Sequence, residues 1–399
     1  KSTLQQEFAK MAEALYDETV QHRRHLHQYP ELSFQENATA DFVEKVLIEI
    51  GFTSIKRMAK TGVVALLHPQ EHIGKVIGLR SDLDALPIHE TNVISYKSKH
   101  EGVMHACGHD VHTAILLSVA KILFSCKNQV IGNVKFIFQP GEELLPGGAS
   151  VLIKEGVLNH PNVDYLIAQH VTPQIPVGKI GFKKGLFMAS TDEIYITVKG
   201  KGGHAAMPHT YVNPLLLASE ILIKLNQFFM IDKTENSLQI PTVLAFGKIN
   251  GAGATNVIPD EVNIAGTFRT LDETWRKKAH QLIKEIAARV AANMKGECEV
   301  DIHFGYPCLV NDEEVTSICM ESAEQMIGKG NIQLLDYRMT AEDFAYFSQI
   351  KPVCFYRLGT GNSQKDTEHN VHNSNFNIDE NVLRYAPAVM AAMAIDLMN

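Results

Sequence analysis

The sequence predicts an α/β fold, with a main domain built on a mostly parallel mixed sheet flanked by helices. Short apolar runs of the kind that form buried strands alternate with segments of helical periodicity, which indicates such a sheet. The 399 residues also exceed the roughly 100–200 residues of one typical domain. Near the middle of the chain the order of elements becomes βαββαβ, which predicts a ferredoxin-like domain inserted into the first.

Within the main domain, apolar residues at helical spacing predict two opening helices, over residues 4–16 and 42–50, and a third over residues 113–124. Gly51 is placed to end the second helix, because glycine tolerates the backbone conformation that follows a last helical turn. The strands are expected at five apolar runs, namely 63–67, 76–79, 134–138, 165–168 and 353–356.

The inserted domain is expected at residues 186–304 and the main domain at residues 1–185 and 305–399, because strands of the first type resume after the insertion. Asn213 and Pro214 suit the N-cap and the first turn of a helix. The expected elements of the insertion are a strand at 194–198, a helix at 214–229, strands at 243–249 and 262–268, a helix at 275–290 and a strand at 299–304.

Charge and cysteine usage exclude several classes of partner. The formal net charge is −8, from 37 basic and 45 acidic residues, and no basic block is long enough to follow a phosphate backbone, so we expect no nucleic acid partner. The longest apolar stretch, residues 386–398, is too short to span a bilayer, so we expect no membrane role. Six cysteines without a CxxC pair fit reduced thiols, and we expect a cytoplasmic protein.

Metal-binding residue types gather where expected strands end and where one expected helix begins. The residues concerned are Asp82, Cys107, His109, Glu142, Glu143 and His170. Because ligands bind beyond the carboxyl ends of the strands in open α/β sheets, we expect these side chains to converge. Thiol, imidazole and carboxylate groups together suit zinc, or manganese at a more oxygen-rich position. The sequence therefore predicts a metal site at this edge of the sheet.

Each of these motifs also has an ordinary explanation when taken alone. Cys107 could be a buried structural thiol, and the pair Glu142-Glu143 could be an exposed acidic turn. As a functional pair, one glutamate would bind metal and the other would act as general base, and the spacing leaves open which does which. His204, in the Gly-rich segment 199–209, could donate to a developing oxyanion or be incidental to a hairpin.

Together these residues resemble the binuclear metallopeptidase family that includes aminoacylases and glutamate-releasing carboxypeptidases. The closer resemblance is to its amidohydrolase branch, typified by hippurate hydrolases, N-acetyl-diaminopimelate deacetylases and auxin-conjugate hydrolases. The resemblance covers nearly the whole chain, and the combination of 105–112 with Glu142-Glu143 is its most specific part. The segments that carry it are 23–32, 80–87, 104–112, 139–143, 202–209, 255–259 and 342–344.

The resemblance implies a catalytic main domain that binds two divalent metal ions, zinc or manganese ahead of nickel or cobalt. Glu142 would be the general base, and Asp82 would be an acid that orients a metal-bound histidine. Arg80 stands where the wider family has a histidine, a departure that matches the amidohydrolase branch. The implied metal ligands are Cys107, His109, Glu143, His170 and His372.

For the inserted domain, the resemblance implies a role as lid and dimerisation domain. His204 resembles a lid histidine that reaches across a dimer to polarise the scissile carbonyl in the other subunit. Asn256 and Arg269 resemble lid residues that hold the substrate, and Arg269 would bind its free α-carboxylate by a forked pair of hydrogen bonds. We therefore expect a homodimer formed through the lid domain.

The expected activity is metal-dependent hydrolysis of the amide bond of N-acetyl or aromatic N-acyl amino acids. A dipeptidase or carboxypeptidase with the same binuclear chemistry is the main alternative. A non-catalytic metal- or peptide-binding relative is a weaker one, because binding alone needs no general base. The cluster of His22, His25 and His27 has no role assigned from the sequence.

Overall fold

The computed structural model describes residues 3–69, 74–231 and 240–399, and the chain divides into two structural units. Unit 1 consists of Lys1–Gly185, Val310–Asp336 and Tyr346–Asn399, and unit 2 of Leu186–Leu309 and Tyr337–Ala345. The short segment Tyr337–Ala345 differs from the expected boundaries, which place it in the main domain. It joins unit 2 through its backbone, because the carbonyls of Arg338 and Thr340 both accept from the amide of Ala189.

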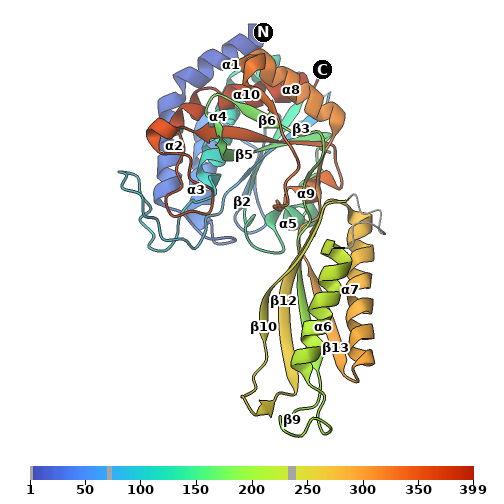
Figure 1. Ribbon diagram of the computed structural model, residues 1–399. Coiled ribbons are helices and arrows are strands. Elements are labelled where there is room, and N and C mark those ends of the chain that lie inside the picture. Colours follow the sequence, from blue (N-terminus) through green and yellow to red (C-terminus); the bar gives the residue numbers. More distant parts are fainter. Residues whose placement is uncertain (1–2, 70–73, 232–239) are drawn as a thin grey trace. The chain divides into compact units, whose positions relative to one another are not determined.

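Unit 1 is built around an eight-stranded mixed sheet in the order β1-β2-β4-β3-β5-β16-β6-β15 (Figure 1). The central strands β4, β3, β5 and β16 are parallel, whereas β1, β2 and β4 pair in antiparallel fashion. The strands are β1 (Ile55–Met58), β2 (Gly62–Leu66), β3 (Val76–Asp82), β4 (Asn133–Gln139), β5 (Tyr165–Pro176), β6 (Ile180–Phe182), β15 (Ile332–Leu334) and β16 (Val353–Gly361). The predicted α/β class, with a mixed sheet flanked by helices, is confirmed.

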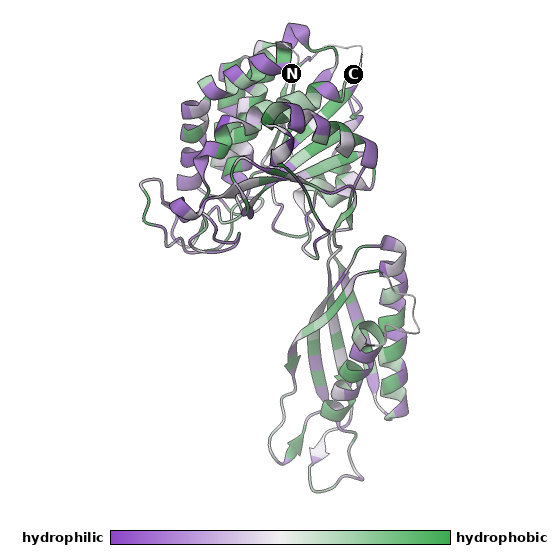
Figure 2. Cartoon of the chain, turned by 45° about the horizontal axis from the view of Figure 1, so that its top comes forward, coloured by the Kyte–Doolittle hydropathy of each residue, from purple (hydrophilic) through white to green (hydrophobic). Residues whose placement is uncertain are grey.

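The helices of unit 1 cover this sheet, and α10 packs against α1, α4 and α8. Figure 2 shows hydrophobic residues along the strands and alternating hydrophilic residues along the outer helices, as expected for elements with one solvated face. These helices are α1 (Thr3–Ala14), α2 (Tyr16–Gln28), α3 (Asn37–Ile50), α4 (His109–Ser125), α5 (Gly148–Lys154), α8 (Glu313–Ile327) and α10 (Ala386–Asp396).

Helix α2 is one of the helices that the sequence did not predict, together with α5, α8 and α10, so three helices and not two open the chain. Its inward face carries Arg23 and His27, whose side chains are fully buried. Because a buried ion network takes the place of an apolar stripe, the hydrophobic periodicity that marks a helix is weak here.

Unit 2 has the elements β8 (Asp192–Lys199), α6 (Pro214–Asn226), β10 (Thr242–Asn250), β12 (Glu261–Thr270), α7 (Glu273–Asn293) and β13 (Glu297–Phe304). Its four strands form an antiparallel sheet in the order β10-β12-β8-β13, and α6 and α7 pack on it and on each other (Figure 1). The side chain of Asn213 caps α6 by accepting from the amide of Leu215, as predicted. A separate apolar core that includes Leu217, Phe268 and Ile283 holds these elements together.

None of the helices in the part of the chain that the structure describes is long and apolar enough to cross a membrane.

Candidate metal centre

The carboxyl ends of β3, β4 and β5 bring the predicted site residues to one edge of the main sheet. Asp82 and Gln139 are the last residues of β3 and β4 and are register partners. His170 was expected to follow a strand ending at residue 168, but β5 continues to Pro176 because β16 pairs with it beyond the end of β3. His170 therefore lies within the strand, two residues beyond Ala168, the last residue of β5 that pairs with β3.

All five predicted ligands lie in one cluster of unit 1. Sγ of Cys107 is 3.3 Å from Nε2 of His170, and Nε2 of His372 is 3.1 Å from Oε1 of Glu143. Nε2 of His109 lies 3.9 Å from the same Glu143 oxygen. Three overlapping groups each keep their ligand atoms within 4.8 Å, namely Cys107-His109-His170, Cys107-Glu143-His372 and His109-Glu142-Glu143. Cys107 and His109 each belong to two groups, so one cluster offers donors for more than one ion.

Hydrogen bonds fix which ring nitrogen of each histidine faces the cluster. Nδ1 of His170 is 2.7 Å from the carbonyl oxygen of Val171, and Nδ1 of His109 is 3.2 Å from Oδ1 of Asp84. Both Nε2 atoms are thereby directed to the cluster, an arrangement that raises the basicity of a metal ligand. Nε2 of His109 is buried and has no hydrogen-bond partner among the described residues, so a cation there would satisfy an otherwise unpaired atom.

The sequence assigned the orientation of a metal-bound histidine to Asp82 alone, but in the structure Asp82 and Asp84 each contact a histidine. Oδ1 of Asp82 lies 2.6 Å from Nδ1 of His112, and Oδ2 accepts from Arg80 at 2.8 Å. The carboxylate that hydrogen-bonds to the predicted ligand His109 is that of Asp84, which also accepts from the amide of Glu143 at 2.9 Å, whereas Oδ2 of Asp82 lies 3.6 Å from Nε2 of His109. Sequence reasoning missed Asp84. The signal in the sequence was its position two residues after Asp82, because side chains two residues apart in an extended chain point to the same side.

Glycines let the ligand-bearing loops approach their neighbours. Gly108, between Cys107 and His109, has φ +82°, and a Cβ there would lie 2.4 Å from Cγ2 of Val171. Gly141 has φ +61°, and its amide donates to Oε1 of the buried Glu36 at 2.8 Å. Any larger residue would be strained and would collide at Gly108, so the loop geometry depends on these positions.

The electrostatics of the cluster favour a cation. Burial raises the pKa of the Cys107 thiol well above its usual value, and the carboxylates of Glu143 and Glu142 raise it further. Burial lowers the pKa of His109, but Asp82 and Asp84 outweigh this effect and raise it to about 10. A divalent ion reverses both preferences, because it binds thiolate and neutral imidazole. The donor set of thiol, imidazole and carboxylate fits zinc or manganese.

Strand β9, which carries His204, lies at one end of unit 2 (Figure 1), and Asn256 is a neighbour of this strand. His204 lies on β9 (Gly203–His204), opposite Val257 of β11 (Val257–Ile258), and the carbonyl of Asn256 accepts from the amide of Ala205 at 3.1 Å. Nδ1 of His204 accepts from the amide of Ala206 at 3.1 Å. In the neutral ring this leaves the proton on Nε2, which makes that nitrogen a hydrogen-bond donor.

Arg269 lies at the other end of the same sheet. It pairs with Val243 near the end of β12, is half-buried, and donates to the carbonyl of Met339 at 3.2 Å. The end of β12 nearer to His204 is Glu261. Eight residues of strand separate Glu261 from Arg269, which corresponds to about 26 Å. One chain therefore does not bring His204 and Arg269 together.

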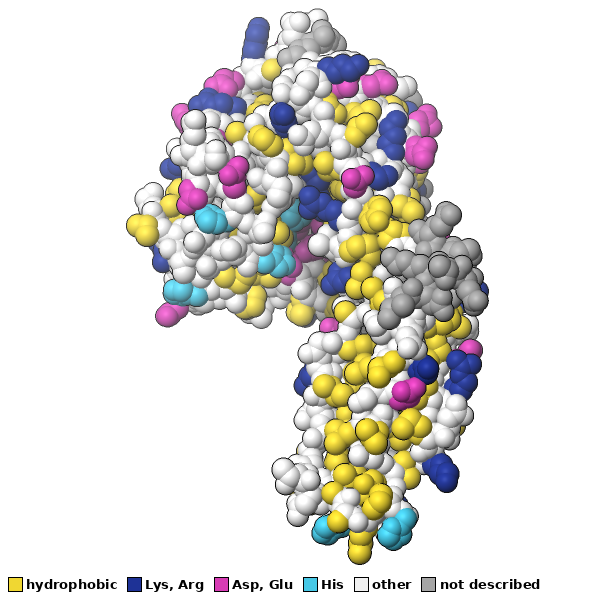
Figure 3. Space-filling model, in the orientation of Figure 1, with side chains coloured by type: hydrophobic (Ala, Val, Ile, Leu, Met, Phe, Trp, Pro, Cys, Tyr) yellow, Lys and Arg dark blue, Asp and Glu magenta, His cyan; other side chains and the backbone are white. Residues whose placement is uncertain are grey.

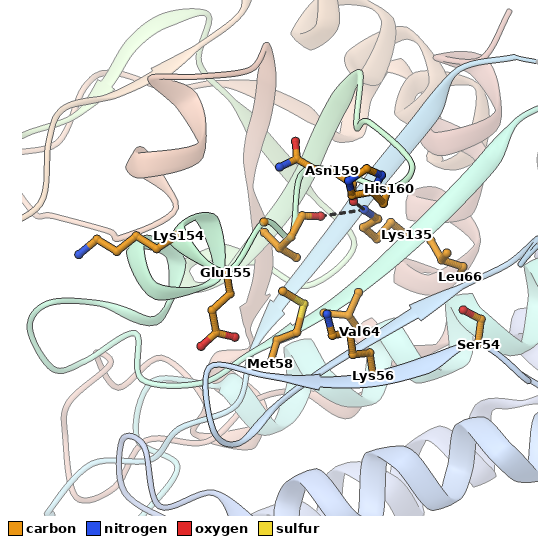
Figure 4. A pocket seen from close by; sticks show the side chains of 12 residues that line it. Ser54, Lys56, Met58, Val64, Leu66, Lys135, Lys154, Glu155, Asn159 and His160 are labelled. Carbon is orange, nitrogen blue, oxygen red and sulfur yellow. Dashed lines mark hydrogen bonds between the residues drawn. The ribbon is translucent and has the colours of Figure 1, made fainter.

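Unit 1 also contains a cavity of about 410 Å³ (Figure 4). Lys135, near the start of β4, lines it and donates to the carbonyls of Val157, Asn159 and Pro161 at 2.8, 2.8 and 3.0 Å. Glu142 and Glu143 follow the opposite end of β4, and no predicted site residue lines this cavity. We assign Lys135 to holding the chain after α5 in place.

Comparison with known proteins shows the family of this chain. Residues 78–396 match the family described as Peptidase family M20/M25/M40. An N-acetyl-L-cysteine deacetylase of Bacillus subtilis is 39% identical over 363 residues, covering 90% of this chain and 83% of that protein. A thermostable carboxypeptidase of Saccharolobus solfataricus is 35% identical over 386 residues, covering 96% of each.

A solved structure of a dinuclear metal binding peptidase from the M20 family of Bacillus subtilis is also similar. It superposes with a TM-score of 0.83 at 32% identity, covering 96% of this chain and 99% of that one. The chain belongs to peptidase family M20/M25/M40, and it is an enzyme of the hydrolase class.

Proposed function

We propose that this protein hydrolyses the amide bond of N-acyl amino acids, using two divalent ions held by Cys107, His109, Glu143, His170 and His372. The convergence of these five side chains at the carboxyl edge of the sheet is the observation that carries the proposal. The similarity to an N-acetyl-L-cysteine deacetylase over 90% of the chain supports the substrate class.

Glu142 is the proposed general base. It is buried, and its carboxylate lies within 4.8 Å of ligand atoms of His109 and Glu143, so it would be next to a water bound by the same ions. When bound, the metal ions would supply Lewis acidity, which activates water and polarises the amide carbonyl. The Glu142 carboxylate would take the proton of the water and return it to the leaving nitrogen, because an amide anion is too basic to depart unprotonated.

His204, Asn256 and Arg269 are the proposed substrate-binding groups of unit 2. Nε2 of His204 would donate to the carbonyl oxygen as negative charge develops there. The Arg269 guanidinium would bind the α-carboxylate of the substrate with two parallel hydrogen bonds. Asn256 would add an amide contact near His204.

The separation of these groups supports a homodimer. An N-acyl amino acid is about two residues long and spans roughly 7 Å, far less than the strand length between His204 and Arg269. If both contact one substrate, they must come from different chains. In this arrangement His204 completes the site of the second subunit.

The helical face of unit 2 offers a surface for this association. Figure 3 shows hydrophobic side chains gathered over unit 2, and Leu216 and Ile223 on α6 are 62% and 51% exposed. A groove between α6 and α7 is lined by these two residues together with Val290 and Met294. Large exposed apolar side chains that cluster in this way are typical of protein interfaces.

A carboxypeptidase or dipeptidase is the second candidate, because the relative from Saccharolobus solfataricus bears that name at 35% identity. The two activities differ in the group beyond the scissile carbonyl. A dipeptide carries a charged amino group, which would have to be paired or desolvated beside the metal ions, whereas an acyl group is neutral.

Steady-state kinetics on a matched panel separate these candidates. We expect kcat/KM for N-acetyl and N-benzoyl amino acids to exceed that for dipeptides with the same C-terminal residue by roughly tenfold or more. Protein stripped of metal serves as the control. Faster cleavage of dipeptides would favour the carboxypeptidase, and no cleavage of either class by metal-loaded protein would overturn the proposed function.

A further inference from the structure

A buried ion network connects helix α2 to the loop that carries two proposed metal ligands. Asp110 directly follows His109 in the first turn of α4, and its Oδ2 accepts from Nε of Arg23 at 2.9 Å. The same oxygen is 2.9 Å from Nδ1 of His27. All three side chains are fully buried.

His27 extends the network to a second carboxylate. Its Nε2 is 2.9 Å from Oε1 of Glu90, whose other oxygen accepts from the amide of Ser98 at 2.7 Å. Because both ring nitrogens of His27 face carboxylate oxygens, the ring makes two hydrogen bonds only when both nitrogens carry protons. Two cations, Arg23 and His27, then face two carboxylates, Asp110 and Glu90.

The rest of the Arg23 guanidinium is also fully engaged. It donates to Oε1 of Glu380 at 3.2 Å and to Oδ1 of Asn377 at 2.9 Å, and it lies over the ring of Tyr96. Asp110 is thus held from two directions by groups that are themselves fixed. His25, by contrast, stacks on the ring of Phe42 at 4.4 Å and contributes packing.

Stability alone does not account for such a network. Taking several charges out of water costs several kcal/mol per ion, and apolar replacements of similar volume are often as stable or more stable. The contacts of the network instead fix the position of the Asp110 carboxylate. Asp110 is one residue from His109 and three from Cys107, so its anchoring restrains the start of α4, where His109 lies, and the residues just before it, which include Cys107.

We propose that Arg23 and His27 are positioning residues, which hold Asp110 and through it set the orientation of Cys107 and His109 for metal binding. This inference rests on the proposed metal centre. It also gives a role to His27, for which the sequence indicated none.

Cobalt binding by the full-length, metal-stripped protein tests the proposal. The affinity is measured by competition with a chromophoric chelator, and the cobalt–thiolate absorption band reports the geometry at Cys107. We expect His27→Gln to weaken cobalt binding by roughly 10–100-fold, the usual effect of losing an outer-shell partner, and to change the absorption band. Glu90 is one hydrogen bond further from Asp110 than His27 is, so Glu90→Gln should weaken cobalt binding less, by roughly tenfold.

Arg24→Gln is the matched control, because Arg24 binds Glu380 from the same helix without contacting Asp110. It should change cobalt affinity by less than about threefold. Melting temperatures of the metal-free proteins identify variants that fail to fold. If His27→Gln does not fold, the cobalt affinity of Glu90→Gln tests the positioning role instead. Wild-type protein that binds no cobalt would overturn the proposed metal centre itself. Wild-type affinity and spectrum in a folded His27→Gln or Glu90→Gln variant would overturn only the positioning role.

Discussion

Replacing Glu142 by glutamine is expected to lower kcat for an N-acetyl amino acid by roughly 10²–10⁴-fold, while the metal content stays at two ions per chain. The amide cannot take up the proton of the attacking water or return one to the leaving nitrogen. The adjacent Glu143, which contacts His372, remains to bind metal. KM should change little, because the variant loses an interaction used in the transition state.

The matched control is Glu155→Gln. Glu155 is a carboxylate at the end of α5 that accepts from the amide of Ala59 at 2.7 Å, remote from the cluster. This variant should keep wild-type kcat. Wild-type turnover by Glu142→Gln would remove Glu142 from the mechanism, and loss of metal from the variant would reassign it as a ligand.

Replacing His204 by alanine is expected to lower kcat by roughly 10²–10³-fold, the usual effect of removing one donor to a developing oxyanion. His209→Ala, in the same exposed loop, is the control and should keep activity. The metal content of both variants should equal that of the wild type, because unit 1 carries all the proposed ligands.

Mixing the two inactive proteins tests whether His204 acts across a dimer. When His204→Ala and Glu142→Gln chains are co-refolded or co-expressed in equal amounts, half of the dimers are mixed. Each mixed dimer has one site with an intact Glu142 and an intact His204 from the other chain, so about a quarter of wild-type activity should return. No recovery despite proven mixed dimers would show that His204 acts within its own chain or not at all.

The sequence predicted at which edge of the sheet the candidate ligands gather, because these residues lie close to local signals, although β3, β5 and β16 all end later than expected. Apolar runs followed by Asp82 or by Glu142-Glu143 needed only the rule that parallel strands end at one edge. His170 was predicted at the right edge although its strand is longer than expected. The extra length comes from pairing with β16, almost two hundred residues away, which no local pattern reports.

Three features that the sequence did not predict depend on contacts distant in the chain. Helix α2 was missed because its buried face is ionic, and its partners Asp110 and Glu380 come from elsewhere in the sequence. The direct contact of Asp84 with His109 depends on the path of the chain beyond β3. The separation of His204 from Arg269 follows from the register of β12 with its neighbours.

The most direct test of the proposed metal-dependent amidohydrolase is a titration of metal-stripped protein with zinc or manganese, followed by hydrolysis of an N-acetyl amino acid. We predict no activity at the start, a rise as metal is added, and a plateau at about two ions per chain. Cys107→Ser should reduce the amount of metal bound and the plateau together, because Cys107 belongs to two of the donor groups. Full activity of protein shown to contain no metal would contradict the account.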